Sequence, residues 1–185
     1  MARISLDPPR SLVLRLVETY SKRQYGKVLE PALAMGHNPK ILMPYLRFEQ
    51  KVGKWHALDE GLKHLAQMVV AARIGCEWCI DFGYWSSQEL GMSPDKASKV
   101  PAWREHREAF SELELLVLDY AESMTATPPT VTDELSARLQ KELGEPAFVE
   151  LTMMAALENL RSRVNSAYGL TGQGFSDQCE IRPVS

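Results

Sequence analysis

The sequence has no long apolar run and no excess of charge of either sign. Its 185 residues hold 21 lysines and arginines against 24 aspartates and glutamates, for a formal net charge of -3. This near balance gives no electrostatic reason to expect a nucleic acid or an anionic membrane surface as a partner. No stretch reaches the roughly 18 apolar residues that a membrane-spanning helix needs, and the first ten residues lack a signal-peptide core. We therefore expect a cytoplasmic protein without a membrane segment.

Cysteine is scarce, with only three in the chain, yet two of them form the pattern Cys76-x-x-Cys79. In a reducing compartment this spacing indicates redox chemistry or metal binding more than a structural disulfide. A structural zinc site needs about four ligands, and the chain offers no second pair; His56 and His64 are the nearest histidines, and Cys179 is distant. We expect no metal. The remaining alternative is two small buried residues that only fill space.

The sequence also lacks the alternating pattern of strands, whereas apolar residues recur at helical spacing along most of its length. We predict an all-α protein of about seven to nine helices in one domain over residues 1–185. The expected parts are an N-terminal arm with helices (1–39), a core (40–170) and a tail (171–185). The main predicted helices, most of them with a capping residue at the start, cover 12–20, 40–52, 60–74, 76–90, 111–124, 133–143 and 147–168.

The cysteine pair lies at a junction of two predicted helices. The helix 60–74, capped by Asp59, ends at Gly75, and a new helix begins at Cys76. Free backbone N–H groups and the helix dipole at such a start favour a thiolate. The pair is therefore placed where a reactive dithiol is favoured.

The motif Gly75-Cys-Glu-Trp-Cys-Ile-Asp81, after an apolar helix, resembles the carboxymuconolactone decarboxylase and alkyl hydroperoxidase D (AhpD-like) superfamily. The segments Phe110–Met124 and Glu150–Asn165 are similar to its C-terminal half. The resemblance implies an all-helical subunit that assembles into trimers or hexamers and uses no cofactor. It also implies reduction of a small hydroperoxide, with Cys79 as the attacking thiolate, Cys76 as the resolving thiol and an external thiol as reductant.

Three positions depart from the redox members of that family. His64 stands where they carry a glutamate, Gly83 where they carry a histidine, and Trp78 where a histidine is frequent. We expect His64 to replace the glutamate as the base that takes the proton of a cysteine, since a neutral imidazole can do so near neutral pH. The alternative is a histidine at the edge of the core.

Two roles are open for each of the other groups of side chains near the motif. The aromatic residues could line an apolar pocket, or belong to the core or a subunit interface: Trp78, Phe82, Tyr84 and Trp85. Glu77 and Asp81 are expected mainly to stabilise the helix start. Three polar residues lie late in the last predicted helix: Arg161, Arg163 and Asn165. They could bind an anionic substrate, but we expect them to form contacts between subunits.

Three functions remain open from the sequence. The first is a thiol-dependent hydroperoxide reductase. The second is a lyase acting on a small carboxylated lactone, with histidine and arginine in place of the cysteines. The third is a non-enzymatic subunit that keeps the cysteines as relics.

Overall fold

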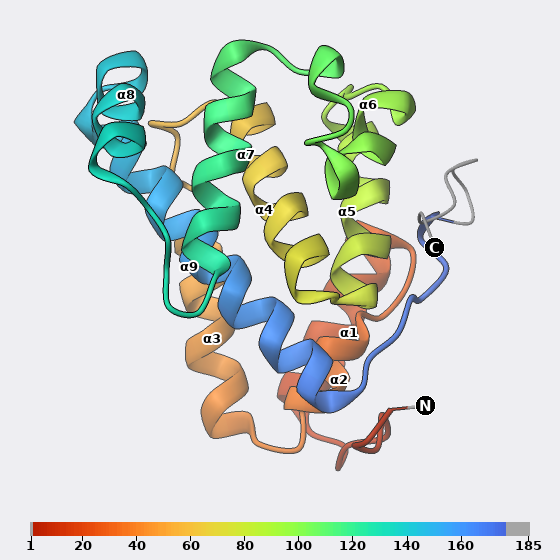
Figure 1. Ribbon diagram of the computed structural model, residues 1–185. Coiled ribbons are helices and arrows are strands. Elements are labelled where there is room, and N and C mark those ends of the chain that lie inside the picture. The colour runs from red at the N-terminus through yellow and green to blue at the C-terminus, as the bar shows by residue number, and fades with distance from the viewer. Residues whose placement is uncertain (1, 177–185) are drawn as a thin grey trace. The chain divides into compact units, whose positions relative to one another are not determined.

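The computed structural model describes residues 2–176, and every regular element in that range is a helix (Figure 1). This confirms the all-α prediction, and Cys179 lies outside the described residues. No helix in the described range is long and apolar enough to cross a membrane. The helices are α1 (Leu12–Tyr25), α2 (Glu30–Met35), α3 (Pro39–Val52), α4 (Glu60–Ile74), α5 (Glu77–Glu89), α6 (Pro94–Lys99), α7 (Glu112–Thr125), α8 (Asp133–Leu143) and α9 (Glu145–Tyr168), with 3-10 turns at Val100–Ala102 and Arg107–Ala109.

The chain divides into two compact units. The first comprises Met1–Trp55 with Ala167–Thr171, and the second His56–Ser166 with Gly172–Ser185. The second unit therefore contains the cysteine pair and every residue of the candidate site described below. A single domain with boundaries at residues 39 and 170 stays a prediction.

In the first unit, α1 starts where its capping residue predicts. The Ser11 side chain accepts a hydrogen bond from the backbone N–H of Leu14. The apolar residues Leu12, Leu16 and Tyr20 are exposed, however, and Leu14 is buried instead. The pattern thus predicted the helix correctly but did not identify its buried side.

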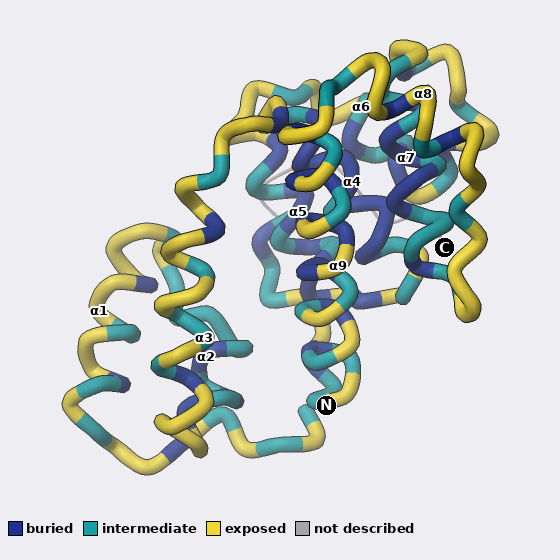
Figure 2. The backbone as a smooth tube through the Cα atoms, turned by 90° about the vertical axis from the view of Figure 1, so that its left-hand side faces the viewer, coloured by how far each residue is buried: buried dark blue, intermediate teal, exposed yellow. Residues whose placement is uncertain are grey.

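The second unit is built around α4, which is buried on nearly all sides (Figure 2). Asp59 caps it through the N–H of Leu62, as expected. It packs side by side with α7 and α5 (Figure 1), and Leu65 and Val70 on α4 and Leu118 on α7 are fully buried. A helix covered on all sides is a core helix, so α4 provides a rigid base for the residues it carries.

The last helix begins two residues earlier than the sequence predicts. We expected the helix to start at residue 147, but α9 starts at Glu145 and includes Pro146 in its first turn. Proline is tolerated there because a first-turn N–H has no partner within the helix. Leu151 and Leu157 lie on its buried side, as their spacing suggests, whereas Leu160 is 48% exposed. The leucines of α9 therefore divide between its buried and its exposed side.

A buried carboxylate connects α9 to the start of α4. Glu150 accepts hydrogen bonds from the N–H groups of Ala57, at 2.7 Å, and Leu58, at 3.2 Å. It also pairs with the ammonium of Lys63 at 2.7 Å. These contacts fix the N-terminal end of α4 against α9, and thereby the residues that follow Lys63.

Candidate active site: the Cys76–Cys79 pair

Gly75 produces the break between α4 and α5. Its φ of 76° is left-handed, and its N–H bonds the carbonyl groups of Ala71 and Ala72. The N–H of Cys76 follows with a bond to the carbonyl of Ala71 at 3.0 Å. A residue with a Cβ is disfavoured in this conformation, which explains the glycine.

Cys76 is the capping residue of α5 rather than its first helical residue. Its Sγ accepts a hydrogen bond from the backbone N–H of Cys79 at 3.3 Å. This is the role that serine or aspartate usually plays at a helix start. The sulfur of Cys76 therefore receives one of the free N–H groups of the first turn, as the spacing suggested.

The two cysteines form a disulfide, with their Cα atoms 5.3 Å apart. Cys76 is 1% exposed and Cys79 is 9% exposed. Among the described residues, no group of three or more His, Cys, Asp and Glu side chains has an arrangement that could hold a metal ion. The arrangement is that of a dithiol that can close on itself, and Cys79 is the more accessible sulfur.

Asn165 contributes a side chain from the far end of the sequence. It is buried on α9, and its Nδ2 donates a hydrogen bond to Sγ of Cys79 at 3.4 Å. We expected Asn165 to share a subunit contact with Arg161 and Arg163, and its hydrogen bond to Cys79 was not predicted. A signal was present, because Glu158, Ser162 and Asn165 recur at helical spacing and all three are buried.

His64 is 6% exposed, and its Nε2 lies 3.1 Å from the carbonyl oxygen of Gly83. A carbonyl only accepts, so Nε2 carries the proton and Nδ1 keeps its lone pair. Burial lowers the pKa of His64 to about 4, against a smaller opposing effect of the bond to Gly83. His64 is therefore neutral near neutral pH. No hydrogen bond joins it to either sulfur within residues 2–176.

Two of the three positions that depart from the redox pattern, His64 and Gly83, thus contact each other. His64 on α4 reaches Gly83 on α5, one turn beyond Cys79 on the same side of that helix. The imidazole is directed to the face of α5 that carries Cys79, and it is held there by backbone rather than by a second side chain.

Asp81 binds a segment near the end of the described chain, the strap, which we define as residues 172–176. Oδ2 of Asp81 accepts from the N–H of Gln173 at 2.6 Å and of Phe175 at 3.1 Å. Oδ1 accepts from the N–H of Ser176 at 2.7 Å and from its hydroxyl at 2.6 Å. Burial by itself raises the pKa of Asp81, but these bonds outweigh it and lower the pKa. Asp81 therefore does more than stabilise a first turn.

The aromatic residues after the cysteines pack with one another. Trp78 stacks on Phe82 with ring centroids 5.1 Å apart, and Phe175 of the strap meets Phe82 edge-on at 5.3 Å. The indole N–H of Trp78 donates to the side-chain oxygen of Gln173 at 3.1 Å. Tyr84 lies apart from them, fully buried in the core. The cluster fixes Trp78, the residue next to Cys79, between α5 and the strap.

Comparison with known proteins identifies relatives at the level of sequence. Residues 39–122 match the carboxymuconolactone decarboxylase family. The uncharacterized protein YnjA of Escherichia coli K12 is 37% identical over 91% of this chain and 94% of its own. The uncharacterized protein YdfG of Bacillus subtilis 168 is 26% identical over 65% of this chain and 82% of its own.

Two solved structures share the fold at low sequence identity. The debrominase Bmp8, as a cysteine-to-alanine variant bound to 2,3,4-tribromopyrrole, superposes with a TM-score of 0.81 at 16% identity, over 96% of this chain and 97% of its own. An uncharacterized peroxidase-related protein from Silicibacter sp. TM1040 gives 0.80 at 14% identity, over 91% and 89%. These structures show the fold, and the family model together with the 37% identical YnjA shows that the chain belongs to the carboxymuconolactone decarboxylase family.

Proposed function

We propose that the protein is a thiol-dependent oxidoreductase that reduces a small hydroperoxide with the Cys76–Cys79 pair. The observation that carries the proposal is the pair itself: two sulfurs joined at a helix start, each with a hydrogen-bond donor. The donors are the N–H of Cys79 for Cys76 and the amide of Asn165 for Cys79. Donors aimed at a sulfur stabilise its anionic form, which is the reactive one.

In the proposed cycle the Cys79 thiolate attacks the outer oxygen of the hydroperoxide. The O–O bond breaks, the alkoxide takes a proton and leaves as an alcohol, and Cys79 becomes a sulfenic acid. The thiol of Cys76 then displaces water from this sulfenic acid and forms the disulfide. Two equivalents of an external thiol return both cysteines to the reduced state.

The assignment of the two roles follows from burial. Cys79 is 9% exposed, whereas Cys76 is 1% exposed and serves as the helix cap. A substrate oxygen must reach the attacking sulfur, but the resolving sulfur has only to reach its neighbour. This supports Cys79 as nucleophile, in agreement with the family pattern.

His64 is proposed as the proton acceptor on the strength of its position. It is neutral near neutral pH, with the lone pair on Nδ1, and it contacts the turn of α5 after Cys79. A neutral imidazole can accept a thiol proton where an imidazolium cannot, and because the pKa of His64 is about 4 it would hold that proton only until the leaving alkoxide, a much stronger base, takes it. Its bond to Gly83 would hold the ring while the proton moves.

The likeness to Bmp8 suggests a second oxidised substrate for the same dithiol. Conversion of a brominated pyrrole to the parent C–H compound consumes two electrons and releases bromide, and oxidation of a dithiol to a disulfide supplies two electrons. The ring of Trp78, the residue before Cys79, stacks on Phe82, and stacked aromatic rings next in sequence to the pair favour a flat apolar substrate. This reaction needs the same two cysteines.

The test is to treat the reduced protein with an organic hydroperoxide, and in a parallel sample with tribromopyrrole, and to analyse its peptides by mass spectrometry. We expect a peptide spanning Cys76 and Cys79 to lose two hydrogens. Cys76→Ser should trap the sulfenic acid on Cys79, Cys79→Ser should not react, and Cys179→Ser is the matched control that should behave as the wild type.

Two results would contradict the proposal. Full thiol-dependent reduction by Cys79→Ser would exclude the mechanism. Activity on a carboxylated lactone that survives loss of both cysteines but not His64→Ala would identify the lyase instead. An unreactive pair in the wild type would leave the non-enzymatic subunit.

A further inference from the structure

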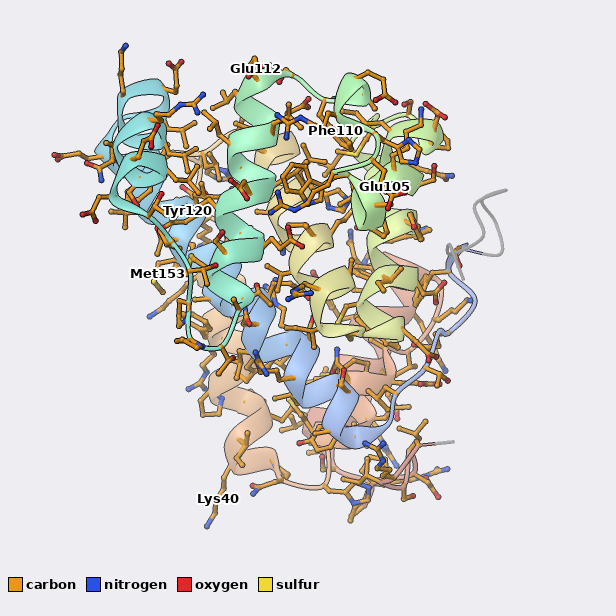
Figure 3. All side chains as sticks on the ribbon, in the orientation of Figure 1. Lys40, Glu105, Phe110, Glu112, Tyr120 and Met153 are labelled. Carbon is orange, nitrogen blue, oxygen red and sulfur yellow. A yellow bond between two sulfur atoms is a disulfide. The ribbon has the colours of Figure 1, made fainter. Side chains whose placement is uncertain are left out.

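Helix α9 carries apolar side chains on its exposed side as well as on its buried side. Leu151, Ala155 and Leu157 are buried, whereas Val149, Met153 and Leu160 are 60%, 43% and 48% exposed. Ala156 is exposed between them. Figure 2 shows the exposed turns along α9, and Met153 is labelled in Figure 3. We call these four residues the α9 seam: Val149, Met153, Ala156 and Leu160.

The spacing of the α9 seam is that of a helix-pairing surface. Its residues follow one another at intervals of four, three and four positions, which is the repeat of two helices packed along their length. The order of intervals is the same read in either direction. A second copy running antiparallel would therefore place Val149 opposite Leu160 and Met153 opposite Ala156.

The charges at the two ends of the seam support this antiparallel arrangement. Glu145 lies four residues before Val149, and Arg163 lies three residues after Leu160. Both side chains are exposed, and neither has an ion-pair partner in the described part of the chain. In the antiparallel register each Glu145 comes opposite Arg163 of the second copy, within one residue. The helix dipoles also oppose each other in that arrangement.

We propose that the α9 seam is a two-fold interface with a second copy of this chain. The surface is self-complementary in the spacing of its residues and in charge, as a two-fold contact requires. Such a contact occurs in a dimer and in a hexamer with two-fold axes, but not in a simple three-fold trimer. It is independent of the proposed function, since every seam residue lies on the side of α9 away from Asn165.

The first experiment measures the mass of the full chain in solution by sedimentation equilibrium. We expect an even multiple of 20.8 kDa for the wild type. Met153→Glu with Leu160→Glu should halve that mass. The matched control is Leu90→Glu, which changes another side chain of similar exposure, 46%, outside α9. It should leave the mass unchanged.

The second experiment tests the antiparallel register. Glu145→Arg and Arg163→Glu should each weaken the association about tenfold at low salt, because each places like charges opposite one another twice. The double variant should restore it. Helix content measured by circular dichroism confirms that each variant is folded. A monomeric wild type, an odd multiple, or a double variant no tighter than the single ones would overturn the proposal.

Discussion

At the scale of single residues, the two sulfurs differ in the donor that each receives. Cys76 is held by backbone, through the N–H of Cys79. Cys79 is held by a side chain, through the amide of Asn165. Only the second donor can be removed by mutation without a change in the helix start.

Replacement of Asn165 by leucine should make Cys79 less reactive. The change removes the donor, and a hydrogen bond to a charged group is worth about 1.5–3 kcal/mol, so the rate of Cys79 alkylation at neutral pH should fall roughly tenfold or more. The measurement is the alkylation rate against pH in the reduced Cys76→Ser background.

Asn159→Leu is the matched control for Asn165. Asn159 lies on the same helix and donates to Thr125 and to the carbonyl of Ala155, without contact to a sulfur. We expect the alkylation rate of Cys79 to stay at the wild-type value in this variant. Equal rates in the Asn165 and Asn159 variants would show that the amide does not act on Cys79.

His64 should make the protein less stable in mild acid. Its pKa is about 4 in the folded chain, below the value of 6.5 for a free side chain. Between these values the unfolded state binds more protons, so the free energy of unfolding rises with pH. The contribution is complete above about pH 6.5, and about 3 kcal/mol of it is lost as pH falls to about 4.

The measurement for His64 is urea unfolding at several pH values. His64→Gln removes the titration while its amide can still donate to Gly83, so the slope between pH 6.5 and 4 should decrease. An unchanged slope in His64→Gln would mean that His64 is not buried in its neutral form.

At the scale of elements, α5 is coupled to the strap through one carboxylate. Asp81 accepts four hydrogen bonds from Gln173, Phe175 and Ser176. The ring of Phe175 also packs on Phe82. The strap thus depends on a charge next to the cysteines.

Asp81→Asn should release the strap. The amide cannot serve all the donors, and hydrogen bonds to a charged acceptor are worth about 1.5–3 kcal/mol each, so a loss of about 3 kcal/mol is expected locally. Hydrogen exchange of residues 172–176 should become faster. Because the pKa of Asp81 is lowered in the fold, its stabilisation is present above its ordinary range and is lost as pH falls through the folded value.

Glu77→Gln is the control for the strap. Glu77 is an exposed carboxylate in the first turn of the same helix. Its replacement changes the same net charge, and exchange in the strap should stay slow. Faster exchange in both variants would assign the effect to net charge or to the helix start rather than to Asp81.

At the scale of the whole molecule, the disulfide should contribute little to stability. It joins two residues that are only three positions apart. In the chain-entropy model a loop this short stabilises the folded state by about 2 kcal/mol. A dithiol reductant should therefore lower the melting temperature by roughly 4–8 °C and leave helix content intact. Loss of the helical signal on reduction would contradict this, and would also exclude a cycle between two folded states. The Cys76→Ser/Cys79→Ser variant should not respond to the reductant.

The helices, their caps, the family and the cysteine pair can all be predicted from the sequence. These depend on short-range patterns: Asp59 and Ser111 cap their helices as predicted, and Gly75 turns the chain where its left-handed φ allows. The position of the cysteine pair at a helix start also depends only on residues close to it in the sequence. Trimeric or hexameric assembly stays a prediction.

The surroundings of the cysteine pair depend on contacts between distant parts of the chain, which the sequence does not reveal. Asn165 meets Cys79 across 86 positions of sequence, His64 meets Gly83 across 19, and the strap meets Asp81 across 92 or more. The exposure of the α9 seam could not be predicted either, because a stripe of apolar residues on a helix predicts a buried side. Helical periodicity says which side chains share a face, but the packing of other helices decides which face is covered and which atoms meet there.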